Sequence, residues 1–372
     1  MTSSITPKPN STNSDLSATD SNKRRHVVVV GGGFGGLAAA RALRSDDLDV
    51  TIIDKTNHHL FQPLLYQVAT AALNPGDIAS PIRSIFRGRK NFNVIMGTVV
   101  DVDKDHQELE LKDGRRVEFD DLVLAPGARY SYFGNDKWSK NAPGLKTLAD
   151  ALHIRERILV SLEKAEQIDD PEERQPYLNY VIIGGGPSGV EMAGAIAEIA
   201  KRQLIQDYKN FDTEDTQIYL VEAMSSILNP YPPSLSEKAR QDLEDMGVNV
   251  LLDSPVTDVR EDGVEIGDRF IETPNVIWAA GVSASPLIKT LDMPTDKSGR
   301  VYVDQDCSLP DYPNIFVIGD AAHLKDPEGD PYPALAPVAL QEGRYVGRLL
   351  KKGTAKEERK RFTYIDKGTM AT

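Results

Sequence analysis

A glycine-rich turn occurs twice in this chain, and each copy lies between the same kinds of segment. The first copy reads VVVVGGGFGGLAAARAL from residue 27, and the second reads VIIGGGPSGVEMAGAIAEIA from residue 181. A β-branched run precedes each turn, and alanine-rich sequence of helical character follows it. Each copy then leads to another short strand that ends in an acid, at Asp54 and at Glu222. This repeated order predicts an α/β protein with two Rossmann-like dinucleotide-binding units.

The first turn fits the pattern G-x-G-x-x-G with Gly31, Gly33 and Gly36. The first glycine permits the tight turn, the second lets the backbone approach a pyrophosphate, and the third lets the helix pack closely on the strand. The free N–H groups of the helix then face the phosphates. Asp54 follows about 20 residues later, where a carboxylate can accept from both ribose hydroxyls. This context favours nucleotide binding over a generic glycine-rich turn.

The second turn repeats the pattern with Gly184, Gly186 and Gly189, and Glu222 ends the next strand after a longer gap. The stretch KRQLIQDYKNFDTEDTQ accounts for the excess as a lengthened helix and loop. The sequence AMSSILNP after Glu222 has no arginine or lysine, so a 2′-phosphate would be repelled and would find no cation. This favours NAD over NADP. The alternative is that Glu222 is only an exposed strand end.

Glu191 lies two residues after the last glycine of the second turn, and we expect it in the first turn of the helix. One role for a carboxylate there is to compensate the helix macrodipole, which is worth about 0.3–1 kcal/mol. The other role is to carry protons near a redox centre. The residues alone leave the two roles open.

Each half also has a later strand closed by small residues, DLVLAPGA at 121–128 and NVIWAAGV at 275–282. A further strand, in NIFVIGDAAHL at 314–324, ends on Gly319 and Asp320. Two dinucleotide folds and this Gly-Asp pair suggest FAD as well as NAD. Asp320 would hold the ribityl and pyrophosphate region of FAD, and residues 300–340 would return to complete a split first fold.

The composition excludes several kinds of protein. The net charge of −13 argues against a nucleic-acid partner, which needs a basic face. The single cysteine, Cys307, rules out an internal disulfide, a CxxC redox pair and a cysteine-rich metal site. The six histidines show no metal-ligand spacing, so we expect no metal. We also expect a disordered arm at 1–22 and no membrane-spanning helix, since no run of about 18 apolar residues occurs.

Other segments complete the outline. LADALHIRERILVSLEKAEQ, from residue 148, predicts an amphipathic helix, and PEERQP at 171–176 predicts a loop and a domain boundary. Residues 90–120 predict short strands with a turn at KDGRR, and PALAPVALQEGRYVGRLL predicts a helix after its prolines. The last piece, RFTYIDKGTMAT, predicts a strand and a turn.

Several segments together carry a more specific likeness. They read GGGFGGLAAA, HHLFQPLLYQVAT, IIGGGPSGVEMAG, IFVIGDAAH, APVALQEGRYV and DKGTMAT. Over about residues 25 to 372 the chain resembles the type II NADH dehydrogenases, which are single-subunit, non-proton-pumping NADH:quinone oxidoreductases. The resemblance implies a glutathione-reductase-like fold, with an NAD domain inserted in a split FAD domain. It also implies FAD and NADH as cofactors and menaquinone or ubiquinone as the acceptor.

The stretch DKTNHHLFQPLLYQVAT, at 54–70, carries a proline and several amides that a plain core strand would not have. By resemblance, Gln62, Pro63 and Leu64 line the flavin ring and Lys55 lies near the cofactor. Apolar walls and amides are what a flavin needs for its rings and its carbonyls. The alternative, a surface loop, leaves the apolar residues unexplained.

The quinone end departs from the family pattern. Many members carry A-Q-x-x-x-Q on a helix near the flavin, but here Pro337 follows Ala336, and only the second glutamine, Gln341, matches. Lys367 matches by position a family lysine near the quinone pocket, although most lysines are simply solvated. Together with Glu191, these residues form the predicted catalytic set of Glu191, Gln341 and Lys367. The predicted cofactor-binding residues are Gly31, Gly33, Phe34, Gly36, Asp54, Lys55, Gln62, Pro63, Leu64, Ala125, Gly127, Gly319, Asp320, Ala336, Gly184, Gly186, Pro187, Gly189, Glu222, Ala280 and Gly281.

The predicted organisation has a disordered arm (1–24), a first FAD-binding part (25–150), an NADH-binding domain (151–298), a second FAD-binding part (299–345) and the start of a C-terminal region (346–372). Family members continue with amphipathic helices that lie on the membrane, and we expect this chain to be a shortened form. The resemblance places the full-length form on the cytoplasmic face of the inner membrane, as a peripheral protein and a candidate homodimer. The shortened chain is expected to be soluble.

Rival functions share the fold. Disulfide reductases need a cysteine pair, and sulfide:quinone oxidoreductases also use cysteines, so a lone cysteine disfavours both. Reductases of ferredoxin or rubredoxin need none and stay open. The chain could also be a slow, redox-sensing flavoprotein, a hypothesis motivated by the altered glutamine motif.

Overall fold

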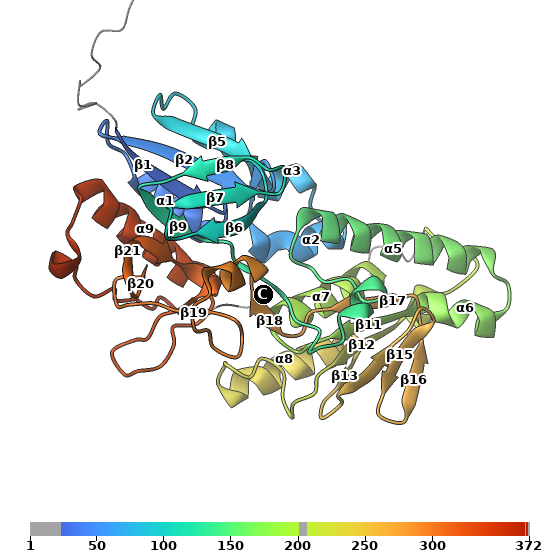
Figure 1. The fold of residues 1–372 in the computed structure, drawn as a ribbon. Coiled ribbons are helices and arrows are strands. Elements are labelled where there is room, and N and C mark those ends of the chain that lie inside the picture. Colours follow the sequence, from blue (N-terminus) through green and yellow to red (C-terminus); the bar gives the residue numbers. More distant parts are fainter. Residues whose placement is uncertain (1–23, 201–206, 369, 371–372) are drawn as a thin grey trace, which may run out of the picture.

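The computed structural model of the chain describes residues 24–200, 207–368 and 370. The predicted N-terminal arm and part of the predicted lengthened helix after the second turn lie outside these ranges. The described chain forms two units, each built on a mainly parallel sheet, which lie side by side (Figure 1). The first unit holds the N-terminal strands and the last long helix, and the second holds the middle of the chain.

The first unit is a six-stranded sheet in the order β20-β21-β9-β1-β2-β5. Its strands are β1 (Arg25–Val30), β2 (Leu48–Asp54), β5 (Phe92–Met96), β9 (Asp121–Leu124), β20 (Ser308–Leu309) and β21 (Tyr312–Val317). The strand β21 pairs in parallel with β9, in the register Ile315 to Leu122. The chain therefore returns to the first sheet after building the second unit, which confirms the split first fold.

The second unit is a four-stranded parallel sheet in the order β13-β12-β11-β17. Its strands are β11 (Asn179–Ile183), β12 (Gln217–Val221), β13 (Val248–Leu251) and β17 (Asn275–Trp278). The strand before each glycine turn, β1 or β11, lies between the strand that ends in the acid and the strand that ends in small residues. The duplication seen in the sequence is thus a duplication of sheet topology.

Each parallel sheet is covered by helices on one face and by a three-stranded antiparallel sheet on the other. In the first unit the helices are α1 (Phe34–Ala42) and α9 (Ala336–Lys352), and the small sheet is β6 (Val99–Asp103), β7 (Glu108–Leu111) and β8 (Arg116–Glu118). In the second unit the helices are α5 (Leu148–Gln167), α7 (Pro187–Glu198) and α8 (Pro233–Asp245), opposite β14 (Val256–Val259), β15 (Gly263–Ile266) and β16 (Arg269–Glu272).

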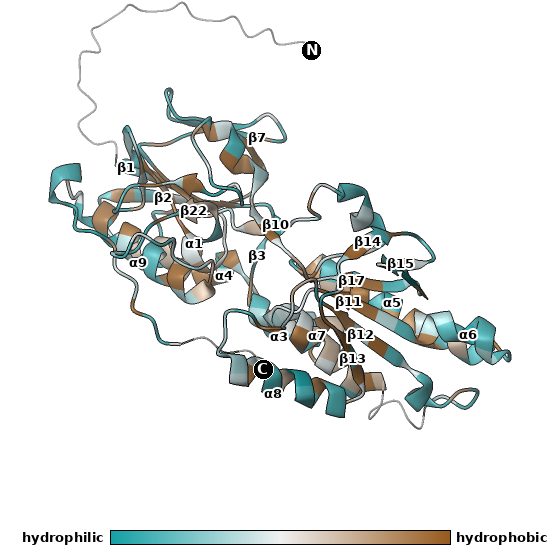
Figure 2. Ribbon diagram, turned by 90° about the horizontal axis from the view of Figure 1, so that it is seen from below, coloured by the Kyte–Doolittle hydropathy of each residue, from teal (hydrophilic) through white to brown (hydrophobic). Residues whose placement is uncertain are grey.

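This burial on both faces explains the β-branched runs. Val27 and Val29 face the helices, whereas Val28 and Val30 face the small sheet, and all four are buried. A parallel strand covered on both sides reads as a continuous apolar run. Figure 2 shows the strands of the second sheet in brown beside the largely hydrophilic helices α6 (Pro171–Leu178) and α8.

Two short strands connect the units. Directly after the small-residue ends of β9 and β17, β10 (Ala128–Tyr130) pairs antiparallel with β18 (Val282–Ala284). The remaining short elements are β3 (His58–Leu60), β4 (Ala79–Pro81), α2 (Leu65–Ala69), α3 (Pro75–Ile78), α4 (Ile82–Ile85), β19 (Val301–Tyr302) and β22 (Ala322–His323). No helix in the described ranges has both the length and the apolar character needed to cross a membrane.

The stretch at 54–70 also bridges the units. Leu65, Val68 and Ala69 of α2 are buried in the core of the second unit, together with Tyr180 and Met192. The residues before them do not enter that core, since Gln62 and Pro63 are exposed. The apolar residues of this stretch therefore fasten the first unit to the second, and the amides and proline lie outside the core.

Three predictions about local structure were wrong. Residues 171–176 are not a loop but part of helix α6, because Asp170 caps the helix by accepting from Glu172 N–H and Glu173 N–H, and Pro171 occupies the tolerated first position. The described part of RFTYIDKGTMAT forms no strand. Glu191 is not in the first turn, because α7 begins at Pro187.

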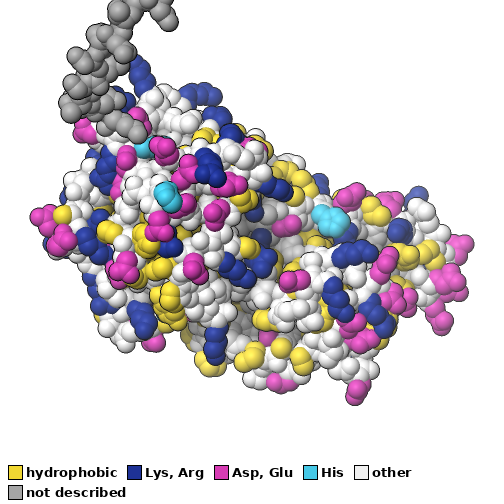
Figure 3. All heavy atoms as spheres, in the orientation of Figure 1, with side chains coloured by type: hydrophobic (Ala, Val, Ile, Leu, Met, Phe, Trp, Pro, Cys, Tyr) yellow, Lys and Arg dark blue, Asp and Glu magenta, His cyan; other side chains and the backbone are white. Residues whose placement is uncertain are grey.

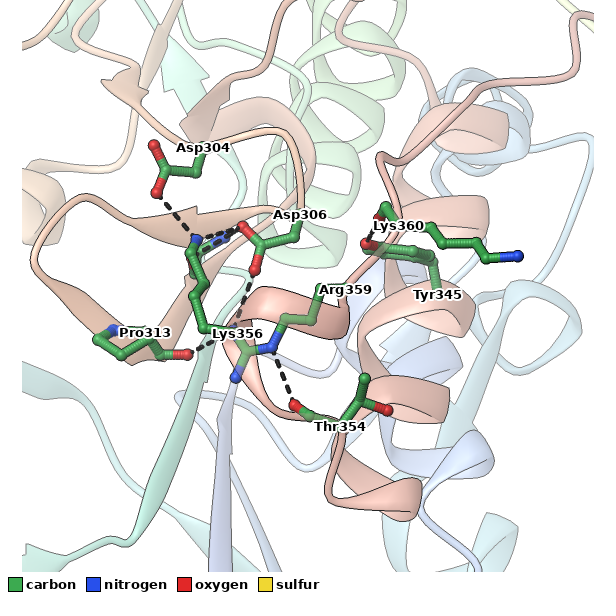
Figure 4. Close-up of polar contacts among 9 residues, drawn as sticks. Asp304, Asp306, Pro313, Tyr345, Thr354, Lys356, Arg359 and Lys360 are labelled. Atoms are coloured by element: carbon green, nitrogen blue, oxygen red, sulfur yellow. Dashed lines mark hydrogen bonds and ion pairs between the residues drawn. The ribbon is translucent and has the colours of Figure 1, made fainter.

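The chain after α9 is held by a cluster of charged side chains, which we call the C-terminal clasp and define as Asp304, Asp306, Lys356 and Arg359 (Figure 4). Lys356 Nζ lies 2.9 Å from Asp304 Oδ2 and 2.8 Å from Asp306 Oδ1. Arg359 Nη1 lies 3.0 Å from Asp306 Oδ2. The clasp fixes residues 354–362 against the strands at the edge of the first sheet, and Phe362 beyond it is buried.

Candidate active site

The first glycine turn is too tightly packed for any other residue at two of its glycines. Gly31 has φ +102°, and a Cβ there would lie 2.2 Å from the carbonyl oxygen of Ala125. A Cβ on Gly36 would lie 1.9 Å from the carbonyl oxygen of Gly31. Real Cβ atoms do not approach so closely, so the strand, the turn and α1 can meet only if both residues are glycine.

The second glycine turn has the same geometry. Gly184 has φ +114°, and a Cβ there would lie 2.8 Å from the backbone nitrogen of Ala280. A Cβ on Gly189 would lie 1.8 Å from the carbonyl oxygen of Gly184. The roles read from the pattern for the first and third glycines therefore hold in both copies.

The middle glycine of each pattern faces open space. Gly33 and Gly186 are the N-cap residues of α1 and α7, and a Cβ on either would meet no atom within 4 Å. Free N–H groups at the start of a helix, with room in front of them, suit a pyrophosphate. The chain thus has the shape and the donors that FAD and a pyridine nucleotide require, once in each unit.

The two acids brace the turns in the same way. Asp54 Oδ2 accepts from Gly32 N–H at 2.6 Å, and Glu222 Oε2 accepts from Gly185 N–H at 2.6 Å. The other oxygen of each carboxylate accepts from the backbone N–H two residues further along the chain. Each acid therefore lies against its own glycine turn and is held there by two backbone N–H groups.

Three segments that are distant in the sequence, those of Gln62, Lys146 and Asp320, come close together. Gln62 Nε2 donates to the carbonyl oxygen of Lys146 at 2.9 Å. Burial lowers the pKa of Lys146, and the nearby charge of Asp320 acts in the opposite direction. Burial likewise raises the pKa of Asp320, against the attraction of Lys146 and Arg300. The predicted residues Gln62 and Asp320 are thus brought to one place, with a lysine that the sequence analysis missed.

The backbone turn that carries Asp320 is held by a hydrogen bond to Glu342 of α9. Gly319 has φ +69°, and its N–H donates to Glu342 Oε2 at 2.6 Å. Glu342 lies on the inner face of α9 and is 2 % exposed. Its burial, reinforced by the nearby charge of Asp320, raises the pKa of Glu342 to about 8 in spite of the hydrogen bond from Gly319.

We expect this buried acid to make stability pH-dependent. A folded-state pKa above the unfolded value means that the folded chain binds the extra proton, so this contribution to stability is full below about pH 4.5 and falls as the pH rises toward about 8. Glu342→Gln keeps an acceptor for Gly319 N–H but cannot ionise. Unfolding midpoints measured from pH 5 to pH 9 should fall less steeply for this variant than for the wild-type protein, and parallel curves would contradict the assignment.

The predicted quinone-side residues are placed as follows. Gln341 binds the backbone of Ile365 through both ends of its amide, at 2.9 and 3.0 Å. It therefore fixes the chain that leads to Lys367, whose side chain is exposed. Pro337 is the second residue of α9, where a proline costs no intrahelical hydrogen bond, and so the change from the family pattern leaves the helix intact.

The other predicted residues lie in the helices and loops around the two glycine turns, or just before β10 and β18. Ala125 and Gly127 follow β9, and Ala280 and Gly281 follow β17, with φ +68° at Gly127 and φ +62° at Gly281. Phe34 and Pro187 are the first residues of α1 and α7, Leu64 precedes α2, Ala336 begins α9, and Lys55 is exposed. Glu191 is half-buried on α7.

Sequence reasoning missed Lys146 and Glu342. Glu342 did carry a signal, because it falls on the same helix face as Val338, Ala339 and Val346, which are all buried. An acid on the apolar face of a helix is worth examining. Lys146 carried none, since it precedes the capping residue Thr147 in a stretch without periodicity.

Two dinucleotide folds in one chain, with an acid-braced glycine turn in each and a Gly-Asp turn returning to the first, define an oxidoreductase that binds a flavin and a pyridine nucleotide. Residues 25–343 match the pyridine nucleotide-disulphide oxidoreductase family. A type II NADH:quinone oxidoreductase of Mycobacterium tuberculosis is 42 % identical over 366 residues, covering 94 % of this chain and 78 % of that protein. The chain belongs to the type II NADH:quinone oxidoreductase family, which confirms the resemblance seen in the sequence.

More distant proteins show the same fold. A type II NADH:quinone oxidoreductase of Staphylococcus aureus is 28 % identical over 94 % of this chain and 87 % of its own length. The structure of NDH2 from Plasmodium falciparum in complex with NADH matches with a TM-score of 0.87 at 20 % identity, covering 94 % of this chain and 88 % of that one. A ferredoxin reductase from Rhodopseudomonas palustris also matches, with a TM-score of 0.74 at 20 % identity over 92 % of this chain and 78 % of that one. The fold alone therefore does not identify the electron acceptor.

Proposed function

We propose that this chain is an FAD-dependent enzyme that oxidises NADH and reduces a membrane quinone, either menaquinone or ubiquinone. The observation that carries the proposal is the pair of glycine turns built alike, each with room for a pyrophosphate and each braced by an acid. Family membership supports the choice of quinone over ferredoxin or rubredoxin as the acceptor. NADH is favoured over NADPH because Glu222, which accepts from Gly185 N–H, would repel a 2′-phosphate.

The proposed division of labour follows the two units. Residues 25–150 and 299–345 hold FAD, residues 151–298 hold NADH, and residues 346–372 begin a C-terminal region. When bound, FAD supplies the ability to accept a hydride from NADH and to pass two electrons on. The chain supplies positioning: the turns fix the pyrophosphates, Asp54 and Glu222 hold the riboses, and Gln62 and Asp320 approach the flavin from opposite segments.

The quinone-side roles of Glu191, Gln341 and Lys367 are part of the proposal. Because Gln341 binds the backbone of Ile365 at both ends of its amide, we assign it the task of placing the last described segment beside α9. Lys367 then lies at the end of a positioned segment, where an exposed ammonium could meet a reduced, anionic acceptor. Glu191 is proposed to move protons.

The decisive experiment is an absorbance spectrum of the purified protein, recorded before NADH, after NADH, and again after a quinone analogue. The oxidised protein should show the yellow flavin bands, NADH should bleach them under exclusion of air, and the quinone should restore them. Protein without flavin bands would contradict FAD binding. Bands that NADH bleaches but that return only with an iron–sulfur protein, and not with menaquinone or ubiquinone analogues, would reassign the acceptor.

Cofactor choice gives a sharper prediction. Replacing Glu222 with glutamine removes the charge that repels a 2′-phosphate but keeps one amide oxygen for Gly185 N–H. We expect NADH affinity to fall and the preference for NADH over NADPH to shrink about 10-fold. Flavin reduction by each nucleotide, measured at several concentrations, gives the ratio. An unchanged ratio would mean that the ribose lies elsewhere.

A membrane surface is the proposed partner, with the protein bound peripherally on the cytoplasmic face of the inner membrane. A groove of about 550 Å³ between α1 and α9 has an apolar floor that includes Leu37 and Leu340. Its rim carries four cations, and no carboxylate of the described chain pairs with them: Arg41, Arg344, Arg348 and Lys351. On the face of the molecule that Figure 3 shows, positive and negative side chains are mixed.

Vesicle sedimentation tests the membrane proposal. The protein should bind vesicles that contain anionic lipid and leave them as the salt concentration rises. Changing Arg344 and Arg348 together to glutamine should weaken this binding, whereas the matched change of Arg115 and Arg116, exposed on the opposite sheet of the first unit, should not. Equal binding by both variants would contradict the role of the groove.

The formation of a homodimer remains a prediction.

A further inference from the structure

Phe133 is the least expected side chain near the second dinucleotide site. It is 68 % exposed and adopts φ +51°. A left-handed backbone is strained for a residue with a bulky side chain, and such strain persists where the surrounding structure imposes it. A ring that is mostly in solvent contributes little to the core, so folding alone does not account for this conformation.

The tip of the Phe133 ring lies on Gly281, at the end of β17. A Cβ on Gly281 would lie 2.6 Å from Phe133 Cζ. The corresponding glycine of the first unit is Gly127, and a Cβ there would meet no atom within 4 Å. The two units are otherwise alike at this position, since both glycines are left-handed and both follow the small-residue end of a strand. Of these two glycines, only Gly281 has an aromatic ring against it.

The residues beside the Phe133 ring are held in place by hydrogen bonds. Trp278 is buried, and its indole N–H donates to the carbonyl oxygens of Ala280 at 2.7 Å and Ser131 at 3.1 Å. Ser131 N–H in turn donates to the carbonyl oxygen of Gly281 at 3.3 Å. The centroid of the Phe133 ring lies 6.3 Å from that of Trp278. The segment that carries Phe133 is thus tied to the end of β17 from both sides.

The strand order tells which half of a dinucleotide passes this ring. Glu222 follows β12 on one side of β11, and Gly281 follows β17 on the other. If the adenosine ribose is held by Glu222 and the pyrophosphate by the turn after β11, the nicotinamide half must pass the end of β17. At this position the exposed face of the Phe133 ring would contact the nicotinamide and not the adenine.

We propose that Phe133 is a specificity residue of the second site, whose exposed ring stacks on the nicotinamide end of NAD(H). This inference rests on the proposed NADH site. It explains why a phenylalanine is kept in a left-handed conformation, and why Gly281 has no side chain where the ring stands. Stacking between flat rings also discriminates between dinucleotides and fragments that lack the second ring.

The test compares NAD⁺ with ADP-ribose, which has the same adenosine and pyrophosphate but no nicotinamide. Dissociation constants are measured by titration calorimetry on the FAD-loaded, oxidised protein, so that no turnover occurs. Phe133→Ala should raise the dissociation constant for NAD⁺ about 3- to 10-fold and leave that for ADP-ribose within twofold. Phe133→Tyr should restore NAD⁺ affinity. The exposed Phe270 on β16 gives a matched control, and Phe270→Ala should change neither constant.

A second variant separates binding from packing. Phe133→Gly removes the ring and the backbone strain together, so the unfolding midpoint should be equal to or higher than that of the wild type while NAD⁺ binds more weakly. A lower midpoint with unchanged NAD⁺ binding would make Phe133 a packing residue and overturn the inference, as would equal changes for NAD⁺ and ADP-ribose. A wild-type protein that bound neither ligand would contradict the proposed NADH site itself.

Discussion

Replacing Gly189 with alanine is expected to abolish NADH binding and to destabilise the second unit by several kcal/mol. The new Cβ would lie 1.8 Å from the carbonyl oxygen of Gly184, which is a backbone atom and cannot rotate away. Relief requires α7 to move away from β11, and overpacking of this kind typically costs about 1–3 kcal/mol or more. The same movement would take the first N–H groups of α7 away from the pyrophosphate. Denaturant unfolding and NAD⁺ titration measure the two effects.

The same helix provides the control for this prediction. A Cβ on Gly194 would make only ordinary contacts, at 3.7 Å to Leu243 Cδ2 and 3.9 Å to Met246 Cε. Gly194→Ala should therefore leave NAD⁺ binding unchanged and increase stability by up to about 1 kcal/mol, because alanine is the better helix former. If both variants behaved alike, the effect at Gly189 would come from helix propensity and not from the turn.

The local sequence was enough to predict those parts of the fold where only one type of residue can physically occupy a position. The glycines at 31, 36, 184 and 189 could be assigned roles because no other residue fits between a strand and a helix at that distance. The β-branched runs predicted the strands that precede the glycine turns, and β1 and β11 confirm them. The return of residues 312–317 to the first sheet was also predictable, since a second glycine turn interrupts the first fold.

The wrong predictions arose where a local signal had two meanings. Prolines and charges at 171–176 suggested a loop, but Pro171 follows the capping residue Asp170, and the same residues then begin a helix. The stretch at 54–70 had to be apolar and polar at once, because Leu65 and Val68 enter the core of the second unit while Gln62 is exposed. Periodicity within one segment does not reveal that its two ends serve different units.

The missed site residues depend on contacts between distant parts of the chain. Lys146 accepts a hydrogen bond from Gln62 and lies near the charge of Asp320 only because the loop before α5 brings it close to both segments. Phe133 looks like an ordinary aromatic residue until its backbone conformation and the neighbouring Gly281 are known. The residues proposed to position cofactors come from motifs, whereas Lys146 and Phe133 could be recognised only from three-dimensional contacts.

The second large effect is expected at the C-terminal clasp, where Asp306→Ala should cost about 3–5 kcal/mol of unfolding free energy. Asp306 and Arg359 have side-chain exposures of 6 % and 9 %, so removing the carboxylate leaves a buried positive charge whose remaining hydrogen bonds go only to the carbonyl oxygens of Thr354 and Pro313. The exposed pair of Arg24 and Asp49 is the control, and Asp49→Ala should be indistinguishable from the wild type in denaturant unfolding. Equal effects at the two positions would show that the clasp is no more than surface charge.

Low pH should break the ion pairs of the C-terminal clasp. Burial by itself would raise the pKa of Asp306, but hydrogen bonds from Lys356, Arg359 and Ser308 outweigh it and hold the pKa below 3.8. A lowered folded-state pKa means that this stabilisation is complete above the unfolded value and is lost as the pH falls through the folded one. The wild type should therefore lose stability more steeply below about pH 4 than Asp306→Ala does. NAD⁺ binding by the variant at neutral pH should be unchanged, because the clasp belongs to the first unit and the proposed nicotinamide site belongs to the second.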